Sequence, residues 1–370
     1  MSWSSAGLSD YRARGADQSF NDVHDLLDYV KTRRDHSERI GHPLDLMVPI
    51  PGSAIEGGAD AVYIGNRKRG SAARLNHHSF GQLASFVPGL KGCLPFMRTH
   101  SNQLAASMFT EAIKRSADRK DLQVLETSTD EGLEIRAVNS PSYGVIWDHE
   151  MVDEIMEHID LSQWQVPAAS RMGTNKTKAT TCYASDRDVY MFLCNESNPI
   201  EIPGSNGRDL MFRGFIAKNS EVGGSSLTWA QFLYRKFCDN RMIWGMEEKD
   251  QVRIRHTSGA PMRFAAELAP KVQQFLQSGT QDTVQKVLAA QNFEVGKEKK
   301  EVIAWTIKHS GVTKAVAESA YDRAEEEEGN PHTVWNIQQG ITAIARDRKH
   351  QDARVQLETQ AGKLMRVVNP

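Results

Sequence analysis

The chain has 370 residues, of which 39% are hydrophobic and 25% are charged, and its formal net charge is -2. These values are typical of a globular protein with two or three folding units, and they exclude disordered, collagen-like and strongly basic chains. Because the whole chain has no excess of positive charge, any binding of a polyanion must come from a local patch.

Targeting signals and cysteine spacing indicate in which cellular compartment a protein is found. No apolar run approaches the roughly 20 residues of a membrane span, and residues 1–7 lack the basic and apolar segments of a signal peptide. The four cysteines, Cys93, Cys182, Cys194 and Cys238, form no Cys-x-x-Cys pair, although Cys182 and Cys194 could face each other across a hairpin. We therefore expect a protein of the reducing cytoplasm with no membrane partner.

The predicted first region, residues 1–120, mixes helices and short strands. Apolar residues at helical spacing predict helices over 20–34, capped by Asn21 or Asp22, and over 79–86 and 103–117. Short apolar runs predict strands at 44–50 and 61–64.

The predicted second region, residues 121–268, is rich in strands. Alternating residues at 122–127 and 133–138 predict a hairpin, a helix follows at 149–159, and strands or hairpins are expected at 180–194, 210–217 and 251–255. A polar turn at 219–226 separates the strand at 210–217 from a short extended piece that is predicted to continue as an amphipathic helix through Cys238.

The predicted third region, residues 269–370, is helical. Helix-period apolar residues follow Pro270, and a long helix is expected from Thr333 onward. Helices at both ends of a strand-rich middle predict the α+β class.

Three blocks of the sequence resemble the phage- and plasmid-borne family catalogued as domain of unknown function 932. Residues 135–143 are similar to that family's Arg-x-Val-x-Ser-x-x-Tyr block, with Asn139 and Pro141 departing from it. Residues 214–240 and 333–364 are similar to two further blocks, so the resemblance covers most of the chain from about Leu122. The family name implies no activity, but the resemblance implies an accessory protein of phages or mobile elements, with binding or annealing of single-stranded DNA as one role.

Basic and aromatic residues of the middle region are the candidates for such binding. Proteins that hold single strands combine cations for phosphates with aromatic faces for bases. Arg253 and Arg255 are the most informative, because residues two apart in a strand share a face. The candidates are Arg136, Tyr143, Tyr190, Arg213, Lys218, Arg235, Lys236, Arg253 and Arg255. Trp229 is a further candidate for stacking, with a core position as its alternative. For each single residue the alternative is an ordinary surface charge or core aromatic.

The turn at 219–226 is expected to be structural. Asn219 is expected to satisfy backbone groups of the turn, and Gly223 or Gly224 to adopt a positive φ or lie against another backbone.

Other chemistries have less support in the sequence. There is no His-Glu-x-x-His motif, no phosphate loop and no Gly-x-Ser-x-Gly motif, so we expect no cofactor and no metal, and we favour a binding protein over an enzyme. The leading hypothesis is a single-stranded DNA-binding protein that forms a homo-oligomer, the alternative is a structural or host-interacting phage protein, and the third is a metal-dependent nuclease.

Overall fold

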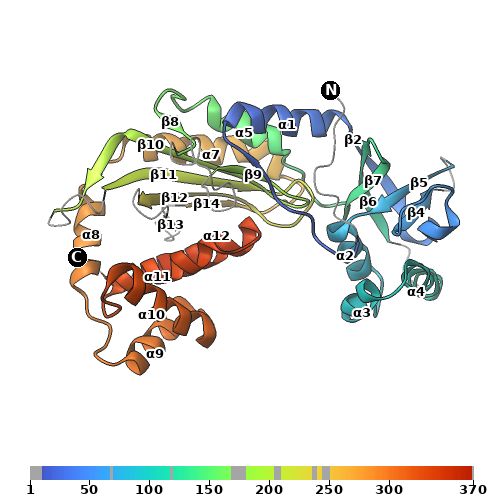
Figure 1. Ribbon diagram of the computed structural model, residues 1–370. Coiled ribbons are helices and arrows are strands. Elements are labelled where there is room, and N and C mark those ends of the chain that lie inside the picture. Colours follow the sequence, from blue (N-terminus) through green and yellow to red (C-terminus); the bar gives the residue numbers. More distant parts are fainter. Residues whose placement is uncertain are drawn as a thin grey trace.

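Two β-sheets lie side by side in the computed structural model, and helices cover both of them (Figure 1). The structure describes residues 11–66, 70–116, 120–167, 181–203, 210–235, 240–243 and 251–368. This arrangement confirms the predicted α+β class.

The first sheet has six strands in the order β2-β6-β7-β5-β4-β3. All neighbours are antiparallel except β5 and β7, which are parallel. The strands are β2 (Ser37–Pro43), β3 (Met47–Pro51), β4 (Val62–Asn66), β5 (Ser71–Leu75), β6 (Asp121–Thr129) and β7 (Gly132–Asn139). The β6–β7 hairpin is the one predicted from alternation, but it pairs with β2 and β5, so the predicted boundary at residue 120 lies between strands of one sheet.

The first sheet shares its core with three helices, α2 (His77–Phe86), α3 (Leu94–Thr99) and α4 (Asn102–Arg115). Phe80 and Phe109 meet edge to face at 5.1 Å in the core between α2, α4 and the strands. Asn76 caps α2 through the backbone N–H of Ser79, so the helix begins at His77, two residues before the start that the sequence suggested.

The second sheet has eight strands, and its centre is the antiparallel meander β10-β11-β12. The strands are β1 (Gln18–Phe20), β8 (Trp164–Gln165), β9 (Cys182–Ala184), β10 (Val189–Glu201), β11 (Leu210–Asn219), β12 (Leu227–Arg235), β13 (Asn240–Ile243) and β14 (Gln251–Ile254). Both β13 and β14 pair with β12, each along one half of its length. Cys182 and Cys194 are free and belong to separate core clusters, so they form no hairpin disulfide.

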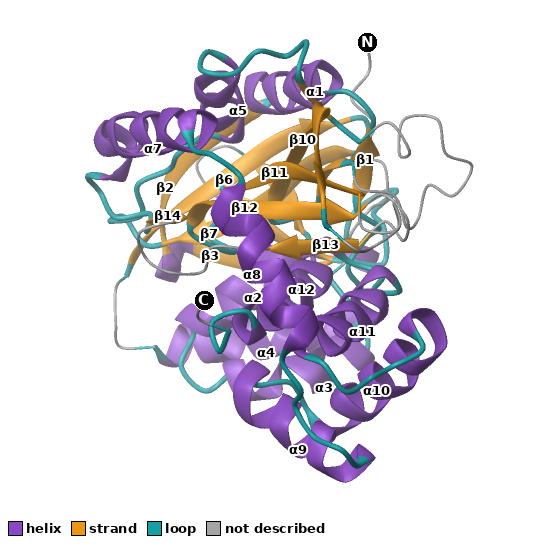
Figure 2. Ribbon diagram, turned by 90° about the vertical axis from the view of Figure 1, so that its left-hand side faces the viewer, coloured by secondary structure: helices purple, strands orange, loops and turns teal. Residues whose placement is uncertain are grey.

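Helices cover both faces of the second sheet (Figures 1 and 2). On one face lie α1 (Val23–Asp35), α5 (Asp148–Met156) and α7 (Ala260–Gln277), with Trp229, Phe215 and Phe275 packed in the core beneath them. On the other face lies α12 (Gln351–Leu364), whose Gly362 touches the backbone of Ile243 so closely that a Cβ would lie 2.1 Å from its carbonyl oxygen. The remaining C-terminal helices are α8 (Gln281–Asn292), α9 (Lys299–Ser310), α10 (Lys314–Glu328) and α11 (Val334–Arg346).

Residues 11–20 connect these parts, and we call them the strap. The Tyr11 ring is buried against Phe80 of the first sheet's core, and β1 adds the end of the strap to the second sheet. Between them, Arg14 pairs with Asp352 at 2.6 Å, and the carboxylate of Asp17 accepts from the backbone N–H of Gln351 at 2.6 Å. Asp17 therefore supplies the N-terminal cap that α12 lacks in its own sequence.

Two predicted elements were wrong. Residues 227–235 form the strand β12, not the start of a helix, because both of its edges are paired with other strands and both of its faces are buried. Helix α7 begins at Ala260 and contains Pro270, which the sequence suggested as the start of the helical region. Among the described residues, no helix combines the length and apolar character that crossing a bilayer requires.

Candidate functional site

The turn between β11 and β12, residues 219–226, lies where the two sheets meet. Gly223 has φ 87°, and a Cβ there would lie 2.8 Å from Oδ1 of Asn139 in the first sheet. Gln82 of α2 donates to the carbonyl of Val222 at 2.7 Å, and the Tyr143 hydroxyl donates to the carbonyl of Ser220 at 2.6 Å. The prediction that Gly223 or Gly224 adopts a positive φ is confirmed at Gly223.

Asn219 and Gly224 also hold the turn in place, although the Asn219 amide donates to groups outside the turn and not, as expected, to the turn's own backbone. The Asn219 amide is fully buried and donates to the carbonyl of Ile146 at 2.8 Å and to Oδ1 of Asp148 at 2.7 Å. The backbone N–H of Gly224 donates to Oγ of Ser220 at 2.7 Å. These bonds fix the start and the end of the turn on either side of Gly223.

A buried charge cluster supports the turn from below. Arg33 of α1 contacts Asp148 at 2.5 Å and Glu221 at 3.2 Å, and Arg136 of β7 contacts Glu221 at 2.5 Å. Burial alone would raise the pKa of Glu221, but the charges of Arg33 and Arg136 outweigh it and lower that pKa to about 2. Burial raises the pKa of Asp148 to about 8, and the charge of Glu221 adds to this effect while Arg33 opposes it. The cluster holds α1, α5 and β7 against the turn.

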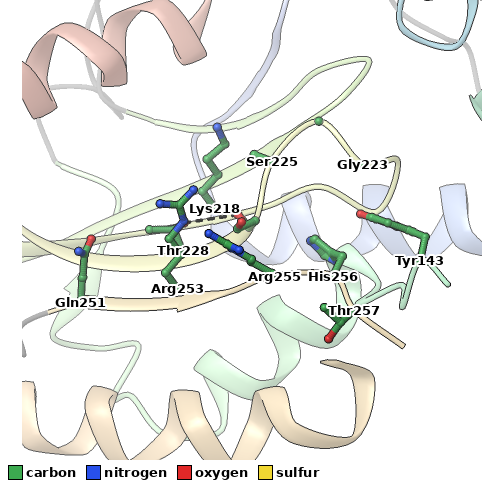
Figure 3. A pocket seen from close by; sticks show the side chains of 12 residues that line it. Tyr143, Lys218, Gly223, Ser225, Thr228, Gln251, Arg253, Arg255, His256 and Thr257 are labelled. Atoms are coloured by element: carbon green, nitrogen blue, oxygen red, sulfur yellow. Dashed lines mark hydrogen bonds between the residues drawn. The ribbon is translucent and has the colours of Figure 1, made fainter. Parts of the chain in front are cut away.

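A cleft of about 600 Å³ opens between the turn and β14. Lys218, Thr228 and Arg253 are direct cross-strand neighbours on β11, β12 and β14, so their side chains share one face of the second sheet. Figure 3 shows Lys218, Arg253 and Arg255 gathered at one end of the cleft, with His256 and then Tyr143 towards the other end. Arg253 and Arg255, for which the sequence predicts a shared face, thus line one cleft together with Lys218.

The two arginines of the cleft, unlike the buried arginines, have no ion-pair partner among the described residues. Arg253 and Arg255 are exposed, and within the part of the chain that the structure describes their guanidiniums have no hydrogen bond or ion pair. Lys218 is half-buried, 3.7 Å from a carboxylate oxygen of Asp188 and 5.1 Å above the ring of Tyr190. No carboxylate side chain lies among the described residues that line this cleft, so its net charge is positive.

The opposite end of the cleft is aromatic. The rings of Tyr143 and His256 stack with centroids 5.0 Å apart and an interplanar angle of 25°. Burial lowers the pKa of His256, so its imidazole is neutral at pH 7 and contributes a ring face rather than a charge. Burial, together with the charges of Asp148 and Glu221, raises the pKa of Tyr143.

Several other predicted residues lie away from the cleft. Arg136, Tyr190 and Arg235 are buried, and Arg235 pairs with Glu328 of α10. Trp229 is a core residue.

The last two residues predicted to bind DNA are Arg213 and Lys236. Arg213 lies on the opposite face of the second sheet, where its guanidinium donates to the carbonyls of Ser278 and Phe275 at 2.7 Å and so caps the C-terminal end of α7. Lys236 lies outside the described residues.

Thr228, Gln251 and His256 are among the residues of the cleft that were not predicted from the sequence. A strand prediction for 227–235 would have placed Thr228 beside Lys218. His256 directly follows Arg255, but a single histidine after a strand carries no specific signal.

The adjacent histidines His77 and His78, at the start of α2, contact other residues. His77 Nδ1 lies 3.0 Å from a guanidinium nitrogen of Arg187, and His78 Nε2 lies 3.2 Å from the carbonyl of Val222. Burial, with the charge of Arg187 contributing to both and that of Arg98 to His77, lowers the pKa of each histidine to about 4. Among the described residues, no three His, Cys, Asp or Glu side chains are grouped in a way that could hold a metal ion.

Comparison with known proteins gives one match. The model of a family described as "Domain of unknown function (DUF932)" matches residues 137–367, which is more than half of the chain. No curated protein and no solved structure matches. The matched segment contains the whole meander, the turn and the cleft. Arg33, Gln82 and Arg136, which contact the turn, come from earlier in the chain.

Proposed function

The chain belongs to the DUF932 family, whose description names no activity, and we propose from the site itself that it binds single-stranded DNA in the cleft beside β14. The observation that carries the proposal is the pair of exposed guanidiniums of Arg253 and Arg255, which open into one cleft with Lys218 and lack a carboxylate partner among the described residues. The stacked rings of Tyr143 and His256 supply an aromatic end, and cations beside aromatic faces are the usual means of holding single strands.

The contrast with the buried arginines strengthens this proposal. Arg33, Arg136 and Arg241 each contact a carboxylate, as expected for a charge withdrawn from water. Arg253 lies on β14 and Arg255 directly follows the strand's last residue, Ile254. The two stand no more than about 7 Å apart along the chain, and their side chains are exposed. A guanidinium matches the geometry of a phosphate, so two of them in this spacing suit neighbouring phosphates of one strand.

The cleft favours binding over catalysis. Its described lining holds hydroxyl, amide, basic and aromatic side chains and one neutral histidine, but no carboxylate. Asp188 contacts the lining, but one of its carboxylate oxygens accepts from Ser225 at 2.7 Å and the other lies 3.7 Å from Lys218, so neither oxygen stands ready as a base or a magnesium ligand. For this reason a nuclease reaction has less support than the binding of a strand.

The biological setting rests on the resemblance to phage and plasmid proteins. We place the protein in the cytoplasm of a bacterial host, as an accessory protein of a phage or other mobile element. Annealing of complementary strands by a homo-oligomer follows from the same proposal if neighbouring copies each hold a strand in this cleft.

The test is a titration of the protein against a fluorescent oligothymidylate of 20 nucleotides over a range of salt concentrations. We expect binding at low salt whose affinity falls as salt rises, because phosphate contacts release counterions. Polyglutamate of similar charge is the comparison, since it offers carboxylates but no bases. Equal affinity for both polymers, or no affinity for the oligonucleotide at 20 mM salt, would overturn the proposal and favour a protein partner. Loss of the labelled oligonucleotide only when Mg²⁺ is added would favour a nuclease.

A further inference from the structure

The cleft is closed at its aromatic end by the loop that follows β7, residues 140–144, which we call the end wall. Tyr143 forms an antiparallel bridge with Thr257, and the backbone N–H of Gly144 donates to the carbonyl of His256 at 3.1 Å. A Cβ on Gly144 would lie 1.9 Å from the carbonyl oxygen of Thr257, so the two segments pack directly against each other. The end wall is therefore joined to the side of the cleft that follows β14.

Tyr143 also joins the end wall to the opposite side of the cleft. Its hydroxyl donates to the carbonyl of Ser220 at 2.6 Å, and a Cβ on Gly223 would lie 3.5 Å from a ring carbon of Tyr143. Figure 3 shows the Tyr143 side chain directed towards the turn that carries Gly223. Gln82 of α2 holds this turn at the carbonyl of Val222. The end wall thus spans the cleft from side to side, and a chain that enters at the arginines meets it.

The two ends of the cleft differ in charge. Its three cations stand at the end away from the wall (Figure 3). Among the described residues, no cationic side chain lines the cleft at the end wall: His256 is neutral, and Arg39, which donates to the carbonyl of Tyr143 at 3.4 Å, is not part of the lining. A phosphate is therefore favoured at the arginines and not at the end wall.

The chemistry of a strand end fits this polarity. An internal nucleotide has a phosphate on both sides of its sugar, so one of the two would have to lie at the end wall. A terminal nucleotide without a terminal phosphate has a hydroxyl on one side, and all of its phosphates continue in one direction. Such a nucleotide can place its base at the aromatic rings and leave its phosphates to the cations.

Given the proposed function, on which this step rests, we infer that the cleft holds the end of a single strand. The terminal base lies at the Tyr143–His256 stack, and the phosphates that follow it lie at Lys218, Arg253 and Arg255. The cleft, at about 600 Å³, has the volume of a small-ligand pocket and accommodates one nucleotide while the rest of the strand continues outward.

The first test compares linear and circular strands on the parent protein. Oligothymidylates of 60 nucleotides, linear or closed into a circle, compete with a 20-nucleotide strand whose fluorophore is on an internal base, so that both ends of the labelled strand are free. The two competitors carry almost the same number of phosphates, so charge alone would give them equal affinity. We expect the circle to compete about 5- to 150-fold more weakly, which corresponds to the loss of one stacked base.

Terminal phosphates test the same site and identify which end it holds. The linear strand carries a phosphate at its 5′ end, at its 3′ end or at both. The added charge would strengthen binding to a site that recognises charge alone. We expect weaker binding when the phosphate is on the end that the cleft holds, because that phosphate must lie at the end wall.

Variants connect the preference for an end to Tyr143. Tyr143→Ala removes the ring and should give the linear strand and the circle equal affinity. Tyr143→Phe is the matched control, because it loses only the hydroxyl bond to Ser220 and should keep the preference. Arg255→Ala should weaken binding of both strands. If Tyr143→Ala does not fold, the comparison of strands on the parent protein still decides.

The outcomes separate the strand-end site from the proposed function. Equal competition by the circle and the linear strand would overturn the strand-end site, and so would unchanged or tighter binding of the strand with both terminal phosphates. In either case an internal segment would be the ligand, and the proposed function would stand. A preference for the linear strand that survives in folded Tyr143→Ala would show that the end wall is not its source. If the parent protein binds none of these strands, the proposed function and the strand-end site both fail.

Discussion

Replacing Arg253 and Arg255 together by Ala removes two of the cleft's cations and leaves Lys218. Both side chains are exposed and neither has a partner among the described residues, so their loss leaves no buried charge unpaired. We expect the free energy of unfolding to change by no more than about 0.5 kcal/mol, as for ordinary surface substitutions. The expected effect is therefore on binding and not on folding.

The magnitude follows from the number of phosphate contacts. If Lys218, Arg253 and Arg255 each contact one phosphate, the slope of log affinity against log salt concentration is about -2.1, at about -0.7 per contact. The double variant keeps one contact and a slope of about -0.7. Between 50 and 200 mM salt the parent protein should lose affinity about 18-fold and the variant only about 3-fold. If the plots of log affinity against log salt for the two proteins converge at about 1 M salt, the variant binds about 60-fold more weakly than the parent protein at 50 mM salt.

The assay is fluorescence anisotropy with the 20-nucleotide strand at four salt concentrations, after urea unfolding has shown that the variant is folded. The control is Lys114→Ala with Arg115→Ala on α4, whose side chains are 66% and 83% exposed and whose loss changes the net charge equally. A folded double variant with the parent's affinity and slope would refute the reasoning. An equal loss in the control would show that only the overall charge matters.

Three further predictions concern the fold around the site. Gly223→Ala should lower the free energy of unfolding by more than Gly89→Ala does. Both residues have positive φ, but of the two only Gly223 has a neighbour within 4 Å of the new Cβ. Equal losses of stability in urea unfolding would contradict this. Asp148→Asn should remove a fall in stability between pH 4 and 8, because in this window the unfolded chain has lost the Asp148 proton while the native protein still holds it. The same pH dependence in both proteins would exclude Asp148 as its source. Asp17→Ala should lower the free energy of unfolding by about 0.5–2 kcal/mol, because it removes a helix cap. Hydrogen exchange in the first turn of α12 should become faster, and unchanged exchange there would show that the cap is dispensable.

The sequence predicts the elements whose periodicity is clear. Helix α4 and the β6–β7 hairpin appear where they were expected, since one face of α4 is polar and a glycine closes the hairpin. β12 was missed because both of its faces are buried, which turns the alternation of a half-buried strand into a nearly continuous apolar run. A run of that kind is compatible with either a strand or a buried helix.

Sequence reasoning anticipated that Arg253 and Arg255 lie on one side of the chain, but it had no means of recognising the buried arginines. A period of two is a local property, so the shared face of the two residues follows directly from the chain. Arg136 and Arg235, by contrast, are neutralised by Glu221 and Glu328, which lie 85 and 93 positions further along. Pairs at such separations depend on the tertiary fold and leave no mark on the local pattern.

The strap has a consequence for how the protein is made. Asp17 and Gln351 are separated by 334 positions, so a ribosome that adds 5–20 residues per second needs about 20–70 s between them. During this interval Arg14 and Asp17 lack their partners on α12, and the strap is open to proteases. Docking of the strap is then among the last steps of folding, and pulse proteolysis of nascent chains should cut within residues 11–20 until α12 has left the exit tunnel. Protection of the strap in shorter nascent chains would show that its contacts with the two sheets are sufficient.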